Sequence, residues 1–145
     1  MPKMKRSAVP HTAVEAHLTM MQGVINRMAT NSASCKAWCV SLVSALLVVI
    51  MDKGKPELLP VAYIPAILFL LLDGYYLVQE KRFRNSYNAF IDKLHANDIV
   101  ANDLYAISPS GSWHVALLHA AKSFSIWPFY AAMIVFIWFA EGLGK

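Results

Sequence analysis

Asp73 is the residue whose type and position most strongly suggest chemistry, because it is an acid inside a long apolar run. The run LLPVAYIPAILFLLLDGYYLVQ, residues 58–79, holds no other charge. Ionisable side chains inside membrane-spanning helices mark ion paths, proton relays or buried ion pairs. Two hypotheses follow for Asp73. It forms a structural salt bridge with Lys36, or it acts in ion conduction or gating, with Tyr76 as a second candidate.

Basic residues interleaved with aromatic residues form the second chemical feature of the sequence. Guanidinium and ammonium groups of this kind bind phosphorylated ligands. They also flank the cytoplasmic ends of membrane spans, where they contact anionic lipid. Both interpretations stay open. The candidate ligand-binding or partner-binding residues are Arg27, Lys81, Arg82, Arg84, Tyr87 and Lys122.

Catalytic and metal-binding motifs are missing from the sequence. It contains no GxSxG, P-loop, GxGxxG or HExxH pattern. His114 and His119 are five residues apart, whereas helical metal-binding pairs are four apart. Cys35 and Cys39 share one helix face, which indicates buried thiols in a helix rather than a redox CxxC pair. We therefore expect no enzyme activity, no metal and no cofactor.

Composition favours a membrane protein. Hydrophobic residues make up 57% of the 145 residues and charged residues only 15%, with a mean hydropathy of +0.44. Soluble domains average about 45–50% apolar and about 25% charged residues. These values exclude a disordered chain, a nucleic-acid-binding tail and most soluble enzymes, and no nucleic-acid partner is expected. The length predicts a single membrane domain, residues 1–145.

Three apolar runs predict an all-α membrane protein with three spans. The first run has no charge between Lys36 and Asp52 and is shorter than the ~20 residues that cross a bilayer. It spans only if the helix continues past Lys36, whose stem can snorkel. Pro128 interrupts the third run and predicts a kink or a helix restart. Core helices of a soluble protein are the alternative, which three such runs in so short a chain disfavour.

The distribution of Lys and Arg predicts the orientation of the spans. Basic residues gather before the first run, after the second and before the third. Because basic residues favour the cytoplasmic side, the N-terminus and segment 80–122 are expected in the cytoplasm. The short turn at 52–57, in which two lysines are balanced by two acids, and the C-terminus are then expected outside.

Two apolar stripes predict that the first two spans continue as a long antiparallel hairpin. The first follows a heptad seam after a capping box formed by Thr12 and Glu15. An N-terminal helix lying flat on the membrane is the alternative. The stripes are Val14, Leu18, Met21, Ile25 and Met28, and Phe83, Tyr87, Phe90 and Leu94. The predicted segments are a cytoplasmic amphipathic helix 12–35, span 36–51, span 58–79, a cytoplasmic helix 80–97, a connector 98–112, and a helix 113–141, capped by Ser112, that includes the third span.

Folding the chain at the short turn sets a register between the two helices. With Met51 facing Leu58, Lys36 pairs with Asp73. A slip of one residue brings the two apolar stripes together, for example Leu18 with Phe90. In this register Asn31 and Ser32 can form hydrogen bonds across the hairpin, and Glu80 can bridge Arg27.

The sequence resembles small bacterial membrane proteins over roughly residues 12–95. The resemblance rests on QGVINRMATNSASCKAWCVSLVSALL, in which a helix enters a first span, and on LDGYYLVQEKRFRNSYNAF, which closes a second. The layout is similar to the SLATT superfamily of two-span effectors, from which the third span departs. The residues that carry the resemblance are Asn26, Arg27, Asn31, Ser32, Asp73, Tyr75, Tyr76, Glu80, Arg82, Phe83 and Arg84.

The resemblance implies a homo-oligomeric effector of antiphage defence in the bacterial inner membrane. Such an effector perturbs the membrane or conducts ions when a signalling enzyme or nucleotide-type ligand reaches its cytoplasmic helices. Small residues in two spans allow close packing between copies. The alternative is a membrane-anchoring accessory subunit that docks a soluble enzyme; a transporter-like bundle is disfavoured because no internal repeat is present. The small residues are Ser41, Ser44, Ala45, Ala131 and Ala132.

Overall fold

A computed structural model describes residues 9–143, and every regular element within that range is a helix. The predicted all-α fold is therefore confirmed for these residues. In chain order the elements are α1 (His11–Asp52), the 3₁₀ helix η1 (Pro56–Ala62), α2 (Tyr63–His95), the short 3₁₀ helix η2 (Ala101–Asp103), α3 (Trp113–Ala121) and α4 (Trp127–Leu143).

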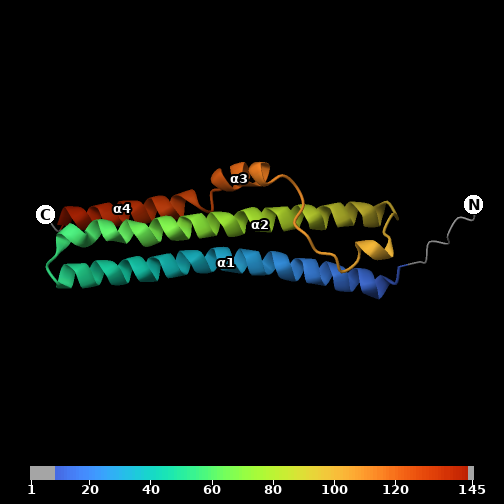
Figure 1. Ribbon diagram of the computed structural model, residues 1–145, viewed down its shortest axis with the longest axis horizontal. Coiled ribbons are helices and arrows are strands. Elements are labelled where there is room, and N and C mark those ends of the chain that lie inside the picture. Colours follow the sequence, from blue (N-terminus) through green and yellow to red (C-terminus); the bar gives the residue numbers. More distant parts are fainter. Residues whose placement is uncertain (1–8, 144–145) are drawn as a thin grey trace, which may run out of the picture.

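Helices α1 and α2 pack side by side and run in opposite directions along the length of the molecule (Figure 1). The turn between them contains Gly54, whose φ of +60° lies in the left-handed region that glycine adopts without steric cost. Helix α4 returns beside the turn end of the hairpin, and α3 packs on α2 near its middle. The fold is thus a long two-helix hairpin with a shorter third layer over α2.

The N-terminal helix and the first predicted span form one continuous helix, as expected. Helix α1 has 42 residues in all, which corresponds to a rise of about 63 Å. The second predicted span, in contrast, begins as 3₁₀ helix η1. Pro60 lies inside η1 and Pro65 in the first turn of α2, and neither has a backbone N–H to donate. The α-helix therefore begins only at Tyr63.

Two clusters of buried side chains hold the helices together. The larger cluster fills the turn end of the hairpin, where α1 presents Cys39, Val43, Leu47 and Ile50 to α2 and α4. The smaller cluster contains Val14, Met21 and Phe90, with Leu18, Tyr87 and Leu94 packed against it. The second set confirms that the two predicted apolar stripes meet.

The predicted capping box at Thr12 and Glu15 is wrong. Helix α1 begins one residue earlier, at His11, with Pro10 as its N-cap and no side-chain capping bond. The Pro10 carbonyl accepts the N–H groups of Ala13 at 3.0 Å and Val14 at 3.3 Å. Pro10 holds the extended cap conformation, because its ring fixes φ. Thr12 therefore lies inside the first turn, and Glu15 instead lies 3.3 Å from His11.

The predicted single helix over residues 113–141 is two helices in the structure. Ser112 is the N-cap residue of α3, as expected, but its hydroxyl makes no capping hydrogen bond. Helix α3 ends at Ala121, and α4 restarts at Trp127 with Pro128 in its first turn, where a missing N–H costs nothing. The Trp127 indole N–H donates to the Ala121 carbonyl across the break.

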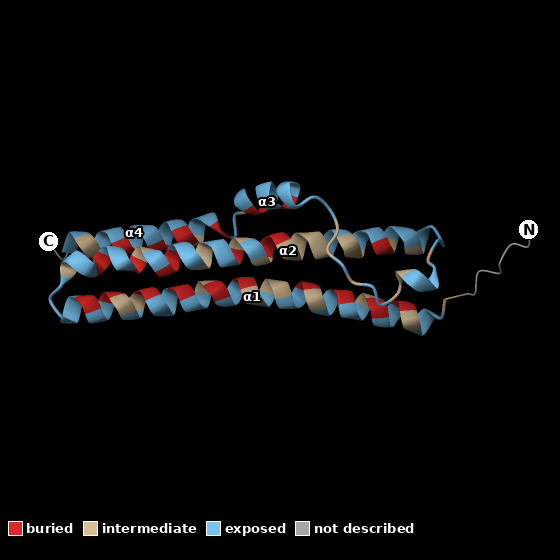
Figure 2. Cartoon of the chain, in the orientation of Figure 1, coloured by how far each residue is buried: buried red, intermediate tan, exposed pale blue. Residues whose placement is uncertain are grey.

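The apolar stretches of the hairpin are mostly uncovered by the rest of the chain (Figure 2). Only 28% of the most apolar 18-residue stretch of α1 is buried, and 33% of that of η1–α2. The core helix of a soluble protein is mostly buried. By length and composition both helices could cross a membrane, while α4 is a shorter apolar helix of 17 residues.

Candidate functional site

A buried ion pair lies where α1 and α2 cross from the apolar half of the hairpin to the polar half. The Lys36 ammonium is 2.5 Å from Asp73 Oδ2, and Ser32 Oγ donates to Asp73 Oδ1. The ammonium also lies 3.4 Å from Ser32 Oγ. The predicted pairing of Lys36 with Asp73 is confirmed, and Ser32 makes the cross-hairpin hydrogen bond that its position indicated.

Both oxygens of the Asp73 carboxylate have partners, which burial makes necessary. The Asp73 side chain is 0% exposed and that of Lys36 20% exposed. A buried charge without a partner is strongly destabilising, whereas a paired and hydrogen-bonded one is tolerated. Asp73 lies inside one chain, so it does not face an outer surface on which the axis of an oligomer could fall. Lys36 and Ser32 of α1 thus hold Asp73 of α2 and join the two helices.

Helix α4 closes the site from the third side. The Tyr130 hydroxyl donates to the Phe69 carbonyl at 3.0 Å, and the Tyr130 side chain is buried. This hydrogen bond attaches α4 to α2 one turn before Asp73. Sequence reasoning missed Tyr130, although a tyrosine one turn into an apolar helix is a recognisable signal for a buried hydrogen bond.

The sequence also singled out three further side chains close to this ion pair along α1 and α2. Cys35 and Cys39 are both buried free thiols on the inner face of α1, as their four-residue spacing predicted. Tyr76 is half-buried, and its ring lies edge-on to Tyr75 at 5.7 Å. No charged partner of Tyr76 is present among residues 9–143, so its predicted gating role stays a prediction.

The six predicted ligand-binding residues do not assemble into one pocket. Arg84 and Tyr87 line a polar groove of about 390 Å³ between α1 and α2, together with Gln22, Ile25, Asn26 and Asn88. Arg27, Lys81, Arg82 and Lys122 are not among the lining residues of that groove. A phosphate pocket formed with Arg27 and Lys122 lies outside this groove and stays a prediction. Residues two apart on a helix point 200° apart, which separates Arg82 from Arg84 by geometry alone.

The charge of Arg84 is already compensated. Its guanidinium lies 2.8 Å from the Glu80 carboxylate one turn earlier. The predicted Glu80–Arg27 bridge is thus replaced by an ion pair within α2, because an i,i+4 partner lies closer than one across the hairpin. Uncharged polar side chains line the rest of the groove. Among them, Gln22 Nε2 donates to the Tyr87 hydroxyl at 3.2 Å. The groove is polar, and the positive charge of Arg84 on its wall is offset by Glu80.

Arg82 points to the opposite side of α2 and holds the connector. Its guanidinium donates to the Pro109 carbonyl at 3.4 Å and to Gln79 Oε1 at 3.3 Å, and it lies 5.7 Å from the Trp113 ring. Ser86 Oγ donates to the Ser108 carbonyl at 2.7 Å. Arg82, a candidate phosphate-binding residue in the sequence, therefore fixes the segment that leads into α3.

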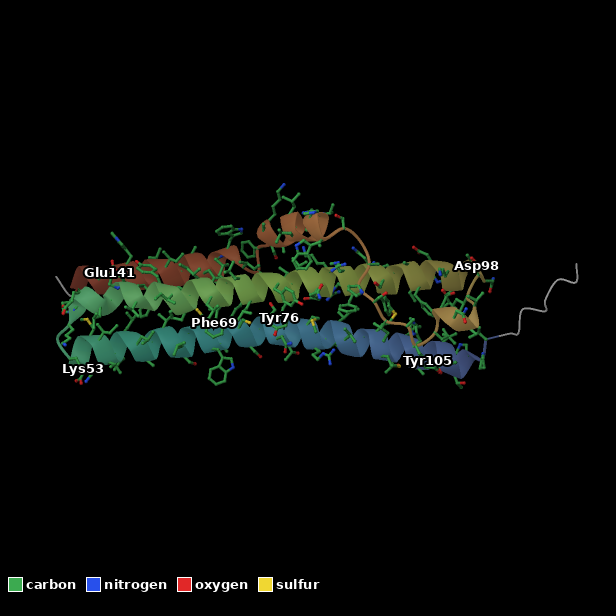
Figure 3. The ribbon with its side chains drawn as sticks, viewed as in Figure 1. Lys53, Phe69, Tyr76, Asp98, Tyr105 and Glu141 are labelled. Carbon is green, nitrogen blue, oxygen red and sulfur yellow. The ribbon has the colours of Figure 1, made fainter. Side chains whose placement is uncertain are left out.

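A second attachment fixes the connector at the N-terminal half of α1. His17 is 1% exposed, packs on Phe90 with ring centroids 4.4 Å apart, and accepts the Tyr105 N–H at Nδ1 at 3.0 Å. Tyr105, labelled in Figure 3, has a left-handed φ of +61°. Burial lowers the pKa of His17 below its usual value, against the opposing effect of Asp103. No sequence signal links His17 to a residue so distant in the chain.

Asp103 fixes the same segment to α2. The Lys93 ammonium donates to Asp103 Oδ1 at 2.7 Å, and Asp103 Oδ2 accepts the Val100 N–H at 3.1 Å. These bonds hold the pKa of Asp103 below its usual range. The connector, residues 98–112, is thus attached to both long helices and leads directly into α3.

Comparison with known proteins identifies no relative of the chain. The chain matches no family model, no curated protein and no solved structure. Among residues 9–143, no three His, Cys, Asp or Glu side chains gather as a metal site would require. The similarity to SLATT-type effectors stays a prediction from the sequence.

Proposed function

We propose that the chain is a multi-pass membrane protein whose long hairpin extends from the bilayer into the cytoplasm. The observation that carries this proposal is the large apolar surface exposed by α1, α2 and α4 near the hairpin turn. A surface of this size in water would drive association, whereas lipid tails cover it without cost. Trp38, Val48, Ile64, Leu71, Val135 and Trp138 are among the residues that form it, each more than half exposed.

The charged residues at the two ends of this surface support a span. Lys53 and Glu141 lie at the turn end (Figure 3), and the Lys36–Asp73 pair marks the other boundary. From Lys36 to Asp52 the helix rises about 24 Å, close to the ~30 Å thickness of a hydrocarbon core. Resistance of the protein to alkaline extraction from membranes tests the proposal. Release into the soluble fraction would refute it.

The uncovered face of α1 supports self-association in the membrane. Ala37, Ser41 and Ala45 are exposed and four residues apart on this face, opposite the face buried against α2. Small residues at this spacing allow helix backbones to approach closely. Ser41→Leu should lower the copy number of the purified assembly, whereas Val40→Leu, an exposed site about 100° around the helix from Ser41, should not.

The effector hypothesis adds an action to this assembly. In it, a signal at the cytoplasmic half changes the packing of the spans and makes the inner membrane permeable, as the resemblance to antiphage effectors implies. An assembly of this kind needs two states that a ligand or partner favours unequally. The connector supports the hypothesis because it joins the cytoplasmic half of both long helices to α3 and α4. Dye release from vesicles containing the protein tests it.

The anchor hypothesis is the second candidate, and the polar groove favours it. Gln22, Asn26, Asn88 and Tyr87 offer hydrogen bonds on the cytoplasmic half without forming a charged path. Burial of Asp73 leaves no charged residue lining the exposed surface of the spans. An anchor subunit should be a monomer or dimer, retain a soluble partner through this half, and leave vesicles sealed.

A further inference from the structure

The outward face of α3 mixes apolar and basic side chains. Val115 is 54% exposed and Leu118 63% exposed, and Phe124 in the following link is 88% exposed. His114, His119 and Lys122 are exposed on the same short segment. Such a face suits neither water, which would leave Phe124 uncovered, nor lipid tails, which would desolvate Lys122.

The inner face of α3 fixes its level along the hairpin. Ala116 and Ala120 are buried in the main core cluster. The Trp113 ring lies 6.0 Å from that of Tyr75 and beside the Arg82 guanidinium. Helix α3 therefore runs over the part of α2 that follows Asp73, just beyond the boundary proposed for the hydrocarbon core.

Side-chain polarity changes in one direction along this part of the chain. The connector carries Asp98 and Asp103, and residues 113–126 contain no acid but hold Lys122 and two histidines. Helix α4 then exposes only apolar side chains until Glu141. This order, from acidic through basic and aromatic to apolar, follows the polarity profile from cytoplasm through a headgroup layer to lipid tails.

We propose that α3 and the link 122–126 lie in the headgroup layer of the cytoplasmic leaflet and bind anionic lipid. The proposal rests on the proposed membrane location and names the part of the chain that contacts the lipid surface. Lys122 faces the lipid phosphates, and Leu118 and Phe124 enter the boundary with the acyl chains, while α3 itself runs along α2 (Figure 1). The break between α3 and α4 then lies at the membrane surface, where water and headgroups satisfy its free backbone groups.

Spin-label depth measurements test this placement in vesicles of phosphatidylcholine and phosphatidylglycerol. Single cysteines replace four exposed residues, Leu118, Phe124, Val135 and Asn102, in a Cys35→Ala/Cys39→Ala background. Accessibility of each label to oxygen and to a water-soluble nickel complex gives its depth. Labels at 118 and 124 should lie about 5–10 Å below the phosphates. The label at 135 should lie deep in the core, and the label at 102 in water.

Each alternative result has a separate meaning. Labels at 118 and 124 as water-accessible as the one at 102, with 135 still deep, would overturn the headgroup placement and leave the membrane proposal intact. Labels at 118 and 124 as deep as the one at 135 would overturn it too, since α3 would then be part of the span. Water accessibility at 135 would refute the membrane proposal itself.

Two further controls address the occupant of this face. Spin–spin broadening at 124 that disappears on dilution with unlabelled protein would assign the face to a second copy and overturn the lipid proposal. Replacing phosphatidylglycerol by phosphatidylcholine should move the labels at 118 and 124 toward water while 135 stays deep. Lys122→Gln should cause a similar shift in the mixed vesicles, and Lys55→Gln, an exposed lysine in the turn at the far end of the hairpin, should not.

Discussion

The ammonium of Lys36 lies 2.5 Å from the carboxylate of Asp73, and this ion pair joins the two long helices where their apolar halves end. Ser32 contributes the second partner of the carboxylate from the same helix as Lys36. All three side chains lie between α1 and α2, where Asp73 and Ser32 are buried and Lys36 is partly exposed. The pair therefore fixes the register of the hairpin at one level, and the helices on either side of it pack through apolar contacts.

Breaking the pair should destabilise the fold. Asp73→Asn leaves the Lys36 ammonium without its counter-charge, which should cost about 3 kcal/mol, the low end for a buried pair because Lys36 is partly exposed. Thermal unfolding in detergent measures the loss. The double variant Lys36→Met/Asp73→Leu should recover most of it, since no charge is then buried. An Asp73→Asn variant with unchanged stability and altered ion permeability would instead support the ion-path hypothesis.

Ser32 allows a smaller and more local test of the same site. Ser32→Ala removes one hydrogen bond to a buried carboxylate and should lower the unfolding free energy by about 1–3 kcal/mol. Ser34→Ala, an exposed serine on the same helix, is the matched control and should change it little. Equal effects of the two substitutions would mean that the Ser32 hydroxyl does not support Asp73.

Acidification should loosen the connector through His17. Because burial lowers its pKa, the folded state favours the neutral ring, and the unfolded chain binds a proton first as pH falls. The stabilisation is therefore fully present above pH 6.5, the pKa of an exposed histidine, and is lost progressively below it. Hydrogen exchange of the Tyr105 amide measures this. His17→Gln should remove most of the pH dependence, and His119→Gln, an exposed control, should not.

Ser86 should control the other attachment of the connector. Its hydroxyl donates to the Ser108 carbonyl and accepts the Ser110 N–H at 2.9 Å. Ser86→Ala removes both bonds, so proteolysis within residues 98–112 should accelerate by the equivalent of about 1–2 kcal/mol of local stability. Ser125→Ala, an exposed serine outside the connector, should leave the rate unchanged. An unchanged rate in Ser86→Ala would contradict the attachment.

The hairpin and its ion pair could be predicted because several sequence features set one register. The short turn places Lys36 opposite the single acid Asp73, and the two apolar stripes agree with this register to within one residue. The connector could not be predicted in the same way. Its attachments join His17 to Tyr105 and Ser86 to Ser108 over long separations, and single hydrogen bonds of this kind leave no periodic pattern.

The basic residues near the start of the polar half of α2 do not share one surface, because a helix directs neighbouring residues to different sides. Arg84 faces α1 and Arg82 faces the connector. The helix break after Ala121 was only half foreseen, because Pro128 indicates a restart but not where the preceding helix ends.

Thiol labelling in intact cells tests the central claim, that the apolar half of the hairpin crosses the membrane with its turn outside. Lys55→Cys and Asn102→Cys, both exposed, are introduced separately into the Cys35→Ala/Cys39→Ala background and treated with a membrane-impermeant maleimide. The account predicts that the cysteine at 55 is labelled in intact cells and the cysteine at 102 only after permeabilisation. Labelling of both positions only after lysis would contradict it.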